Sequence, residues 1–112
     1  MFLGYDTFSV KGKTGHVYTF NAAPYPFVDA PNVPAVFLLA RMDGEPKGQV
    51  AVHFAFEGQT DDLRRELSRH RKPSPGNPLH PNAILWRRVD DAGARLAICN
   101  DLRAPKLDIS QN

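Results

Sequence analysis

The sequence lacks the features that mark secreted and membrane proteins. Its 112 residues contain one cysteine, Cys99, which excludes an intramolecular disulfide and fits a reducing compartment. The longest apolar run, residues 35–40, is far too short to span a membrane. The first ten residues have neither a basic start nor a long apolar run, so they do not resemble a signal peptide. We therefore expect a cytoplasmic protein of bacterial type with no membrane association.

A strong charge of either sign is also lacking. The chain has 14 Lys and Arg against 12 Asp and Glu, a net charge of +2, which favours a polyanionic partner only weakly. Its hydrophobic share of 42% is ordinary for a globular protein and argues against wholesale disorder. Because no internal repeat and no domain boundary stand out, we predict a single domain over residues 1–112, long enough for a modest core.

Apolar patterns predict two hairpins and one further strand. Residues 8–22 (FSVKGKTGHVYTFNA) alternate on both sides of a glycine-containing turn, which is typical of a hairpin. The alternating pairs are Phe8 with Val10 before the turn, and Val17 with Thr19 or Tyr18 with Phe20 after it. Residues 35–41 (AVFLLAR) predict a central strand buried on both faces, and residues 49–56 (QVAVHFAF) predict its hairpin partner. Residues 83–89 (AILWRRV) predict another strand of the same sheet.

Two helices are predicted between and after these strands. Residues 60–70 (TDDLRRELSRH) predict a helix with Thr60 as its N-cap and with Leu63 and Leu67 facing the core. Residues 91–104 predict a last helix that Asp90 or Asp91 caps and Pro105 ends. The residues expected to be buried on this helix are Leu96, Ile98 and Leu102.

The remaining stretches are rich in proline. Residues 23–34 and 72–82 contain four prolines each, and we expect both to be loops. The predicted fold class is therefore α+β, with a small, mostly antiparallel central sheet flanked by helices and with an N-terminal β-hairpin.

Three short motifs, in this order and spacing, carry a resemblance to a known family. They are FSVKGKTGHVY (residues 8–18), GQTDDL (residues 58–63) and RLAICNDL (residues 95–102), with His70 twelve residues after Gly58. The chain resembles the GIY-YIG nuclease superfamily, and within it a group of small bacterial members with an N-terminal F-x-G-K-S/T-G-x-x-Y hairpin. The resemblance extends from about Phe8 to about Leu102, which is most of the chain.

The resemblance implies metal-dependent cleavage of a phosphodiester. Two tyrosines on paired strands would activate water, an arginine on the first helix would bind the phosphate, and a glutamate on the later helix would hold one divalent metal. In this chain the tyrosine positions hold Phe37 and Phe56, the arginine position holds Glu66, and the glutamate position holds Cys99, which we expect to face Glu66. A glutamate repels phosphate, and a thiol is a poor ligand for magnesium. We therefore expect a catalytically inactive member without a cofactor.

Several residues near these positions have two interpretations. Arg64, Arg65, Arg69, His70, Arg71 and Lys72 form either a nucleic-acid-binding patch or a solvated face near a helix C-terminus. Glu66 and His70 are four residues apart, which favours an ion pair over a new metal site. Since no other histidine has ligand spacing with His70, no metal site is expected. Cys99 is either a buried, inert thiol or a thiol whose pKa Arg95 lowers.

Three functions remain open at this stage. The first is a binding module for DNA or RNA. The second is a protein-interaction or structural role, including a homo-oligomer, in which Tyr25, Phe27 and Val28 of the proline-rich loop cover a partner. The third is an active endonuclease that uses Mg²⁺, with Arg65 or Arg69 serving the phosphate and Asp101 the metal.

Overall fold

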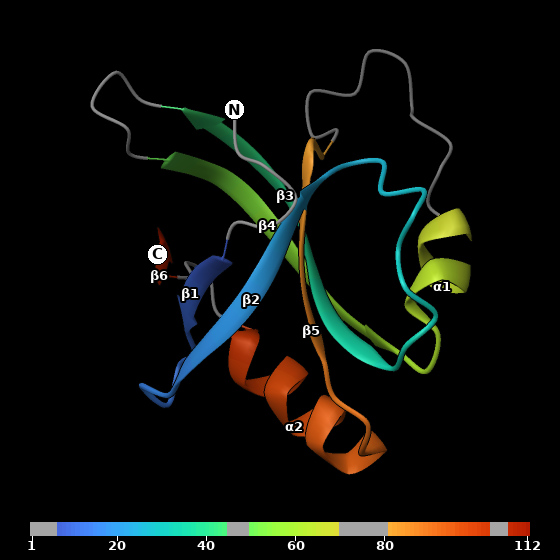
Figure 1. Cartoon of the computed structure of the whole chain (residues 1–112). Coiled ribbons are helices and arrows are strands. Elements are labelled where there is room, and N and C mark those ends of the chain that lie inside the picture. Colours follow the sequence, from blue (N-terminus) through green and yellow to red (C-terminus); the bar gives the residue numbers. More distant parts are fainter. Residues whose placement is uncertain (1–6, 45–49, 70–80, 104–107) are drawn as a thin grey trace.

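The structure is a computed structural model that describes residues 7–44, 50–69, 81–103 and 108–112, with the side chains of residues 43–44, 50–56 and 111 outside the description. Within these residues, six strands form one antiparallel sheet in the order β4-β3-β5-β2-β1-β6, and two helices pack on it (Figure 1). The strands are β1 (Thr7–Lys11), β2 (Val17–Pro24), β3 (Ala35–Gly44), β4 (Val50–Thr60), β5 (Ala83–Arg88) and β6 (Asp108–Gln111), and the helices are α1 (Leu63–Arg69) and α2 (Ala92–Leu102). The predicted α+β class and the N-terminal hairpin are confirmed.

Both predicted hairpins are present. β1 pairs with β2 from Thr7↔Asn21 to Lys11↔Val17. Gly15 in the connecting turn has a φ of 90°, which lies in the left-handed region that glycine adopts readily. β3 pairs with β4 on one side and with β5 on the other, so it is a central strand, as its continuous apolar sequence predicts.

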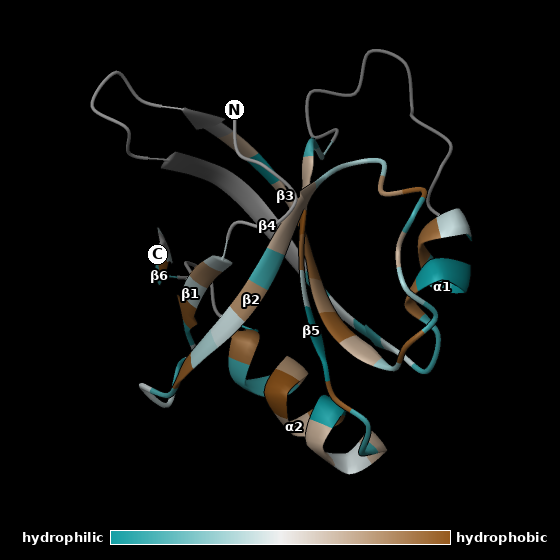
Figure 2. Cartoon of the chain, in the orientation of Figure 1, coloured by the Kyte–Doolittle hydropathy of each residue, from teal (hydrophilic) through white to brown (hydrophobic). Residues whose placement is uncertain are grey.

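The two faces of the sheet carry separate apolar clusters. Neighbouring residues of a strand point to opposite faces, so β3 contributes Val36 and Leu38 to one cluster and Phe37 to the other. The larger cluster includes Cys99 and Leu102 of α2, and the smaller one includes leucines of α1. Figure 2 shows the apolar positions of β3 and α2 in brown. The helices therefore cover opposite faces of the sheet.

The sheet is curled, so that its two edge strands approach each other. β4 and β6 come close across the curl without pairing. β6 pairs with β1 from Phe8↔Gln111 to Lys11↔Asp108. β6 was not predicted from the sequence, because four residues without apolar alternation give no strand signal.

The predicted N-cap of the first helix is wrong. Thr60 is the last residue of β4, where it pairs with Ala35. The cap is Asp62, because its Oδ1 accepts a hydrogen bond from the backbone N–H of Arg65, at 3.2 Å. In α2 the cap is Asp91, one of the two predicted residues, and its carboxylate accepts from the backbone N–H of Ala94 at 2.7 Å.

One predicted core residue of α2 is also wrong. Leu96 is 54% exposed, whereas Leu102 is buried and Ile98 packs partly against the larger cluster. The side of α2 that faces the sheet carries Arg95, Cys99 and Leu102, which are spaced by four and three residues. Leu96 lies one position beyond Arg95 and so points to solvent.

A pair of leucine substitutions tests this division of the core. We expect Leu38→Ala to reduce the free energy of unfolding by about 2–5 kcal/mol, because the side chain is fully buried between β4 and β5 in the larger cluster. Leu96→Ala should change it by no more than about 0.5 kcal/mol. Urea unfolding followed by circular dichroism measures both, and equal losses would contradict the assignment.

Candidate functional site

Phe37 lies in the middle of β3, in the smaller apolar cluster, with Leu63 and Leu67 of α1. It is 5% exposed. Its ring lies directly over Gly58 of the paired strand, where a Cβ atom would come within 2.5 Å of the ring Cζ. Phe37 is therefore a buried packing residue that requires a glycine opposite it. The backbone of Phe56 pairs with Leu39 of β3, and its side chain lies outside the described residues.

Glu66 is on α1, the helix that covers the face of Phe37. Its carboxylate is partly buried, and its Oε2 lies 3.7 Å from Nη1 of Arg69. The predicted partner of Glu66, His70, lies outside the described residues. An acid therefore occupies the position where the resemblance implies a phosphate-binding arginine, and it forms an ion pair with Arg69, the next arginine along the helix.

Cys99 is on α2 and is 3% exposed. Burial raises the pKa of its thiol, and the negative charge of Glu57 raises it further, against a smaller opposing effect of Arg103. Arg95 does not lower this pKa, because its guanidinium is directed to Gln59 and to two backbone carbonyls. The alternative of an activated thiol is thus wrong.

The structure does not bring these positions onto one surface. Phe37 and Cys99 belong to different apolar clusters on opposite faces of the sheet. Glu66 is on α1 and Cys99 on α2, so the expectation that Cys99 faces Glu66 is wrong. The reason is the alternation of side chains in β3, which separates the two helices by the thickness of the sheet.

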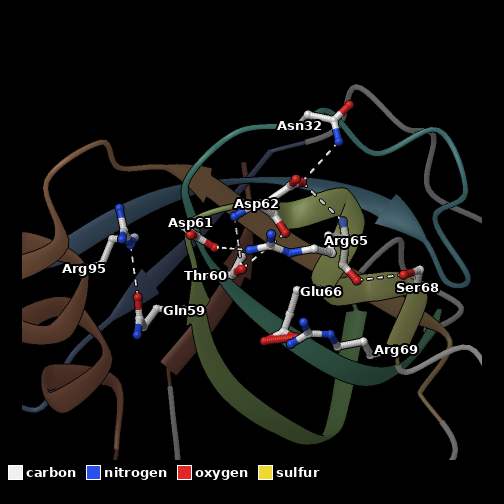
Figure 3. A network of polar contacts seen from close by, with 10 residues as sticks. All are labelled: Asn32, Gln59, Thr60, Asp61, Asp62, Arg65, Glu66, Ser68, Arg69 and Arg95. Atoms are coloured by element: carbon white, nitrogen blue, oxygen red, sulfur yellow. Dashed lines mark hydrogen bonds and ion pairs between the residues drawn. The ribbon is translucent and has the colours of Figure 1, made fainter.

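The residues of GQTDDL form a junction between the two helices at the end of β4 (Figure 3). Gln59 accepts a hydrogen bond from Arg95 Nε of α2, at 3.0 Å. Thr60 accepts through its hydroxyl from the backbone N–H of Asp62, at 3.1 Å, and so closes the turn before α1. Each of these residues thus has a structural partner.

The two aspartates of the motif stabilise α1 and the preceding loop. Asp61 accepts from Nη2 of Arg65 at 2.6 Å. Asp62 caps the helix through Arg65 N–H and accepts from the side-chain amide of Asn32 at 3.1 Å. The hydrogen bond from Asn32 and those from the helix lower the pKa of Asp62. Gly58 packs beneath the ring of Phe37. The fold alone therefore accounts for the polar residues and the glycine of GQTDDL.

The carboxylate of Asp101 holds the turn of the N-terminal hairpin. Its Oδ1 accepts from the backbone N–H of Thr14 at 2.9 Å, and its Oδ2 accepts from the hydroxyls of Thr14 at 2.9 Å and Tyr18 at 2.8 Å. A Cβ on Gly12 would collide with the same carboxylate. We call Gly12, Thr14, Tyr18 and Asp101 the Asp101 cluster. It joins the first and the third motif of the sequence into one structural unit.

The charges of this cluster follow from its hydrogen bonds. The backbone N–H of Thr14, followed by the hydroxyl of Tyr18, lowers the pKa of Asp101. Burial, followed by the hydrogen bond to Asp101, raises the pKa of Tyr18. The structure does not bring Asp101 to Arg65 or Arg69, because those arginines are on α1, on the opposite face of the sheet.

The arginines of α1 are exposed but largely paired. Arg65 bonds to Asp61, and Arg69 lies near Glu66, while Arg64 is exposed. His70, Arg71 and Lys72 lie outside the described residues. In β5, Arg87 donates to the carbonyl of Thr19 at 3.0 Å, and Arg88 donates to Asp90 at 2.9 Å. The predicted patch therefore consists of three exposed arginines within the described part of the chain.

Two structural polar residues were missed by the sequence analysis. The side-chain amide of Asn82 accepts from Met42 N–H at 2.8 Å and donates to Met42 C=O at 2.7 Å, as a strand backbone would. Arg95 is 7% exposed, and its guanidinium donates to Gln59, Val89 and Asp90. No local pattern signals either role, because Asn82 depends on Met42 and Arg95 depends on Gln59, forty and thirty-six positions away.

Comparison with known proteins leaves the chain without an assigned relative. No family model matches it, and neither a curated protein nor a solved structure matches it. Within residues 7–44, 50–69, 81–103 and 108–112, no group of three or more His, Cys, Asp or Glu side chains is placed to hold a metal ion. In the same part of the chain, no helix is long and apolar enough to cross a membrane.

The contact between Phe37 and Gly58 predicts a steric effect. Gly58→Ala should reduce the free energy of unfolding by about 1–3 kcal/mol, because the new methyl group meets the ring at 2.5 Å. Phe37→Leu in the same chain should recover part of this loss, so that the two changes are not additive. The control is Gly93→Ala in the exposed first turn of α2, where a Cβ meets only the side-chain oxygen Oδ2 of Asp91, at 3.3 Å, and where alanine favours the helix, so we expect a much smaller change. Additive losses in a double-mutant cycle would argue against the contact.

The Asp101 cluster predicts a dependence of stability on pH. Because folding lowers the pKa of Asp101, its contribution is present above the unfolded value of about 3.9 and is lost as the pH falls through the folded value. We expect Asp101→Asn to lower the melting temperature at neutral pH, and the difference from the wild type to shrink as the pH falls below the unfolded value of about 3.9. Asp90→Asn, at an exposed ion pair, is the matched control. A difference that is independent of pH would contradict the role of this carboxylate.

Proposed function

We propose that the chain is a catalytically inactive GIY-YIG-like domain that acts as a binding module. The observation that carries this proposal is Phe37, a buried phenyl ring without a hydroxyl at the position where the resemblance implies a water-activating tyrosine. Glu66, on the helix over the same face, has the wrong charge for phosphate. The order of elements also supports the resemblance, since a hairpin, a helix, a strand and a second helix follow one another from β3 to α2.

Cys99 gives no support to the proposal that the domain is inactive. Its place on the opposite face of the sheet removes the support for aligning it with a metal-binding glutamate. The relocated active site, with Asp101 as metal ligand, has little support, because both oxygens of that carboxylate accept hydrogen bonds from the hairpin. Mg²⁺ would be a cofactor only if that active alternative held.

The ligand class that we propose is DNA or RNA, bound through the exposed side of α1. Arg64, Arg65 and Arg69 are exposed there within about two helical turns. The ion pairs of Arg65 with Asp61 and of Arg69 with Glu66 are on the surface, where such pairs contribute only about 0–1 kcal/mol. Phosphate oxygens therefore compete with these carboxylates for the guanidinium groups.

Binding is tested by fluorescence anisotropy with labelled DNA and RNA oligonucleotides at several salt concentrations. We expect an affinity that falls as salt rises, and we expect the combined change Arg64→Gln and Arg69→Gln to reduce the salt slope by about 2. The matched control is Arg103→Gln, which removes an exposed arginine directly after α2. An affinity that salt does not change, or that Arg103→Gln weakens equally, would reject this interface.

Inactivity is tested separately by plasmid nicking with Mg²⁺ and with Mn²⁺. We expect no cleavage above the background of a heat-unfolded sample. Cleavage by the wild type that Asp101→Asn or Arg65→Gln abolishes, in folded protein, would overturn the proposal and establish the active alternative.

A further inference from the structure

β4 is the longest strand of the described chain and lies at the edge of the sheet. It has eleven residues, whereas β6, at the other edge, has four. Within the described residues, β4 pairs with β3 and with no other strand. An edge strand presents a row of unpaired backbone N–H and C=O groups, which are able to pair with another chain.

The outer half of β4 extends beyond the rest of the sheet. β5 pairs with β3 only from Ala35 to Ala40. The remaining residues of β3, Arg41–Gly44, pair with Val50–Phe54 of β4 and form a two-stranded arm, which Figure 1 shows at the upper left. The amide of Asn82 holds the base of this arm at Met42. A two-stranded ribbon is only marginally stable in water, whereas three or more strands are stable.

The β4 segment of this arm lacks most of the usual protection of an edge strand. Residues 50–56 (VAVHFAF) contain six apolar residues and no proline, lysine or other charged residue. Edge strands of soluble proteins usually carry such residues, because these prevent pairing with another chain. One protective feature is present within this segment: Arg41 pairs with Phe54 and Met42 with Val52, so His53 of β4 is an extra residue at a bulge near the base of the arm.

We propose that the arm is a dimerisation element in which β4 pairs antiparallel with β4 of a second copy of this chain. A two-fold axis brings the same backbone groups together from both copies, and the product is a four-stranded arm. A second copy fits best because residues 50–56 carry no charge: identical segments meet without repulsion, and a charged peptide finds no counter-charge. This inference is independent of nucleic-acid binding.

The experiment is sedimentation velocity of the full chain, without nucleic acid, over a wide range of concentration. We expect a reversible dimer for the wild type. Ala51→Lys should raise the dimer dissociation constant about tenfold, because each copy then carries a lysine on the edge that pairs, and a lysine on an edge strand hinders pairing. Within the chain, position 51 pairs with position 43 of β3, which is an aspartate in the sequence, so the substitution adds no pair of like charges to the hairpin. Val17→Lys, at an exposed position of the interior strand β2, is the matched control and should leave the dimer unchanged.

A second measurement locates the contact without a substitution. Hydrogen exchange of the wild type, followed by mass spectrometry at low and high concentration, should show slower exchange of residues 50–56 in the concentrated sample. A monomer at all concentrations would overturn the proposal. So would a dimer with unchanged exchange in residues 50–56, or one that folded Ala51→Lys protein forms as readily as the wild type.

Discussion

The carboxylate of Asp101 connects parts of the fold that are almost a whole chain length apart. Thr14 and Asp101 are separated by 87 positions, and two hydrogen bonds of 2.9 Å join them. Tyr18 donates a third hydrogen bond to the same carboxylate. Because α2 is thereby fixed to the turn between β1 and β2, Cys99 and Leu102 of this helix stay packed on the larger apolar cluster. The glycine-containing turn, whose backbone N–H groups suit an anion, here binds a carboxylate of its own chain.

The junction at the end of β4 also connects separate elements through polar side chains. Gln59 connects to α2, whereas Asp61 and Asp62 connect to α1, so one short segment relates both helices to the sheet. The residues that make the sequence resemble a nuclease are thus occupied with holding the scaffold together. A surface function has to come from side chains outside these motifs, such as the arginines of α1, or from the backbone of the edge strand β4.

The pattern of apolar residues was sufficient to predict most of the sheet. β2, β3 and β5 follow directly from alternating or continuous apolar runs, and Asp91 follows from the ordinary chemistry of a helix cap. The failures have identifiable physical causes. Leu96 is exposed because Arg95 lies on the side of α2 that faces the sheet, where it hydrogen-bonds to Gln59, and periodicity alone assigns no arginine to a core. Thr60 is not the cap, because β4 continues through it.

The candidate site was harder to predict for a related reason. Sequence spacing places Glu66 and Cys99 on helices, but it does not say which face of the sheet each helix covers. That choice depends on the register of β3, where Val36 and Phe37 point in opposite directions. Likewise, the role of Asn82 depends on Met42, forty positions away, and no local pattern contains that information.

Asn82 also affects how this chain can vary in length. Its side-chain amide supplies the donor and the acceptor that Met42 would otherwise find in another strand residue, and its own N–H donates to Ala40 C=O. The hydrogen-bond ladder between β3 and β5 therefore ends in a side chain, whereas β3 continues along β4 to Gly44. Residues inserted or deleted between α1 and this point do not change the register of β5 on β3. We therefore expect a change in the length of the proline-rich sequence before Asn82 to leave the pairing of β5 with β3 in place.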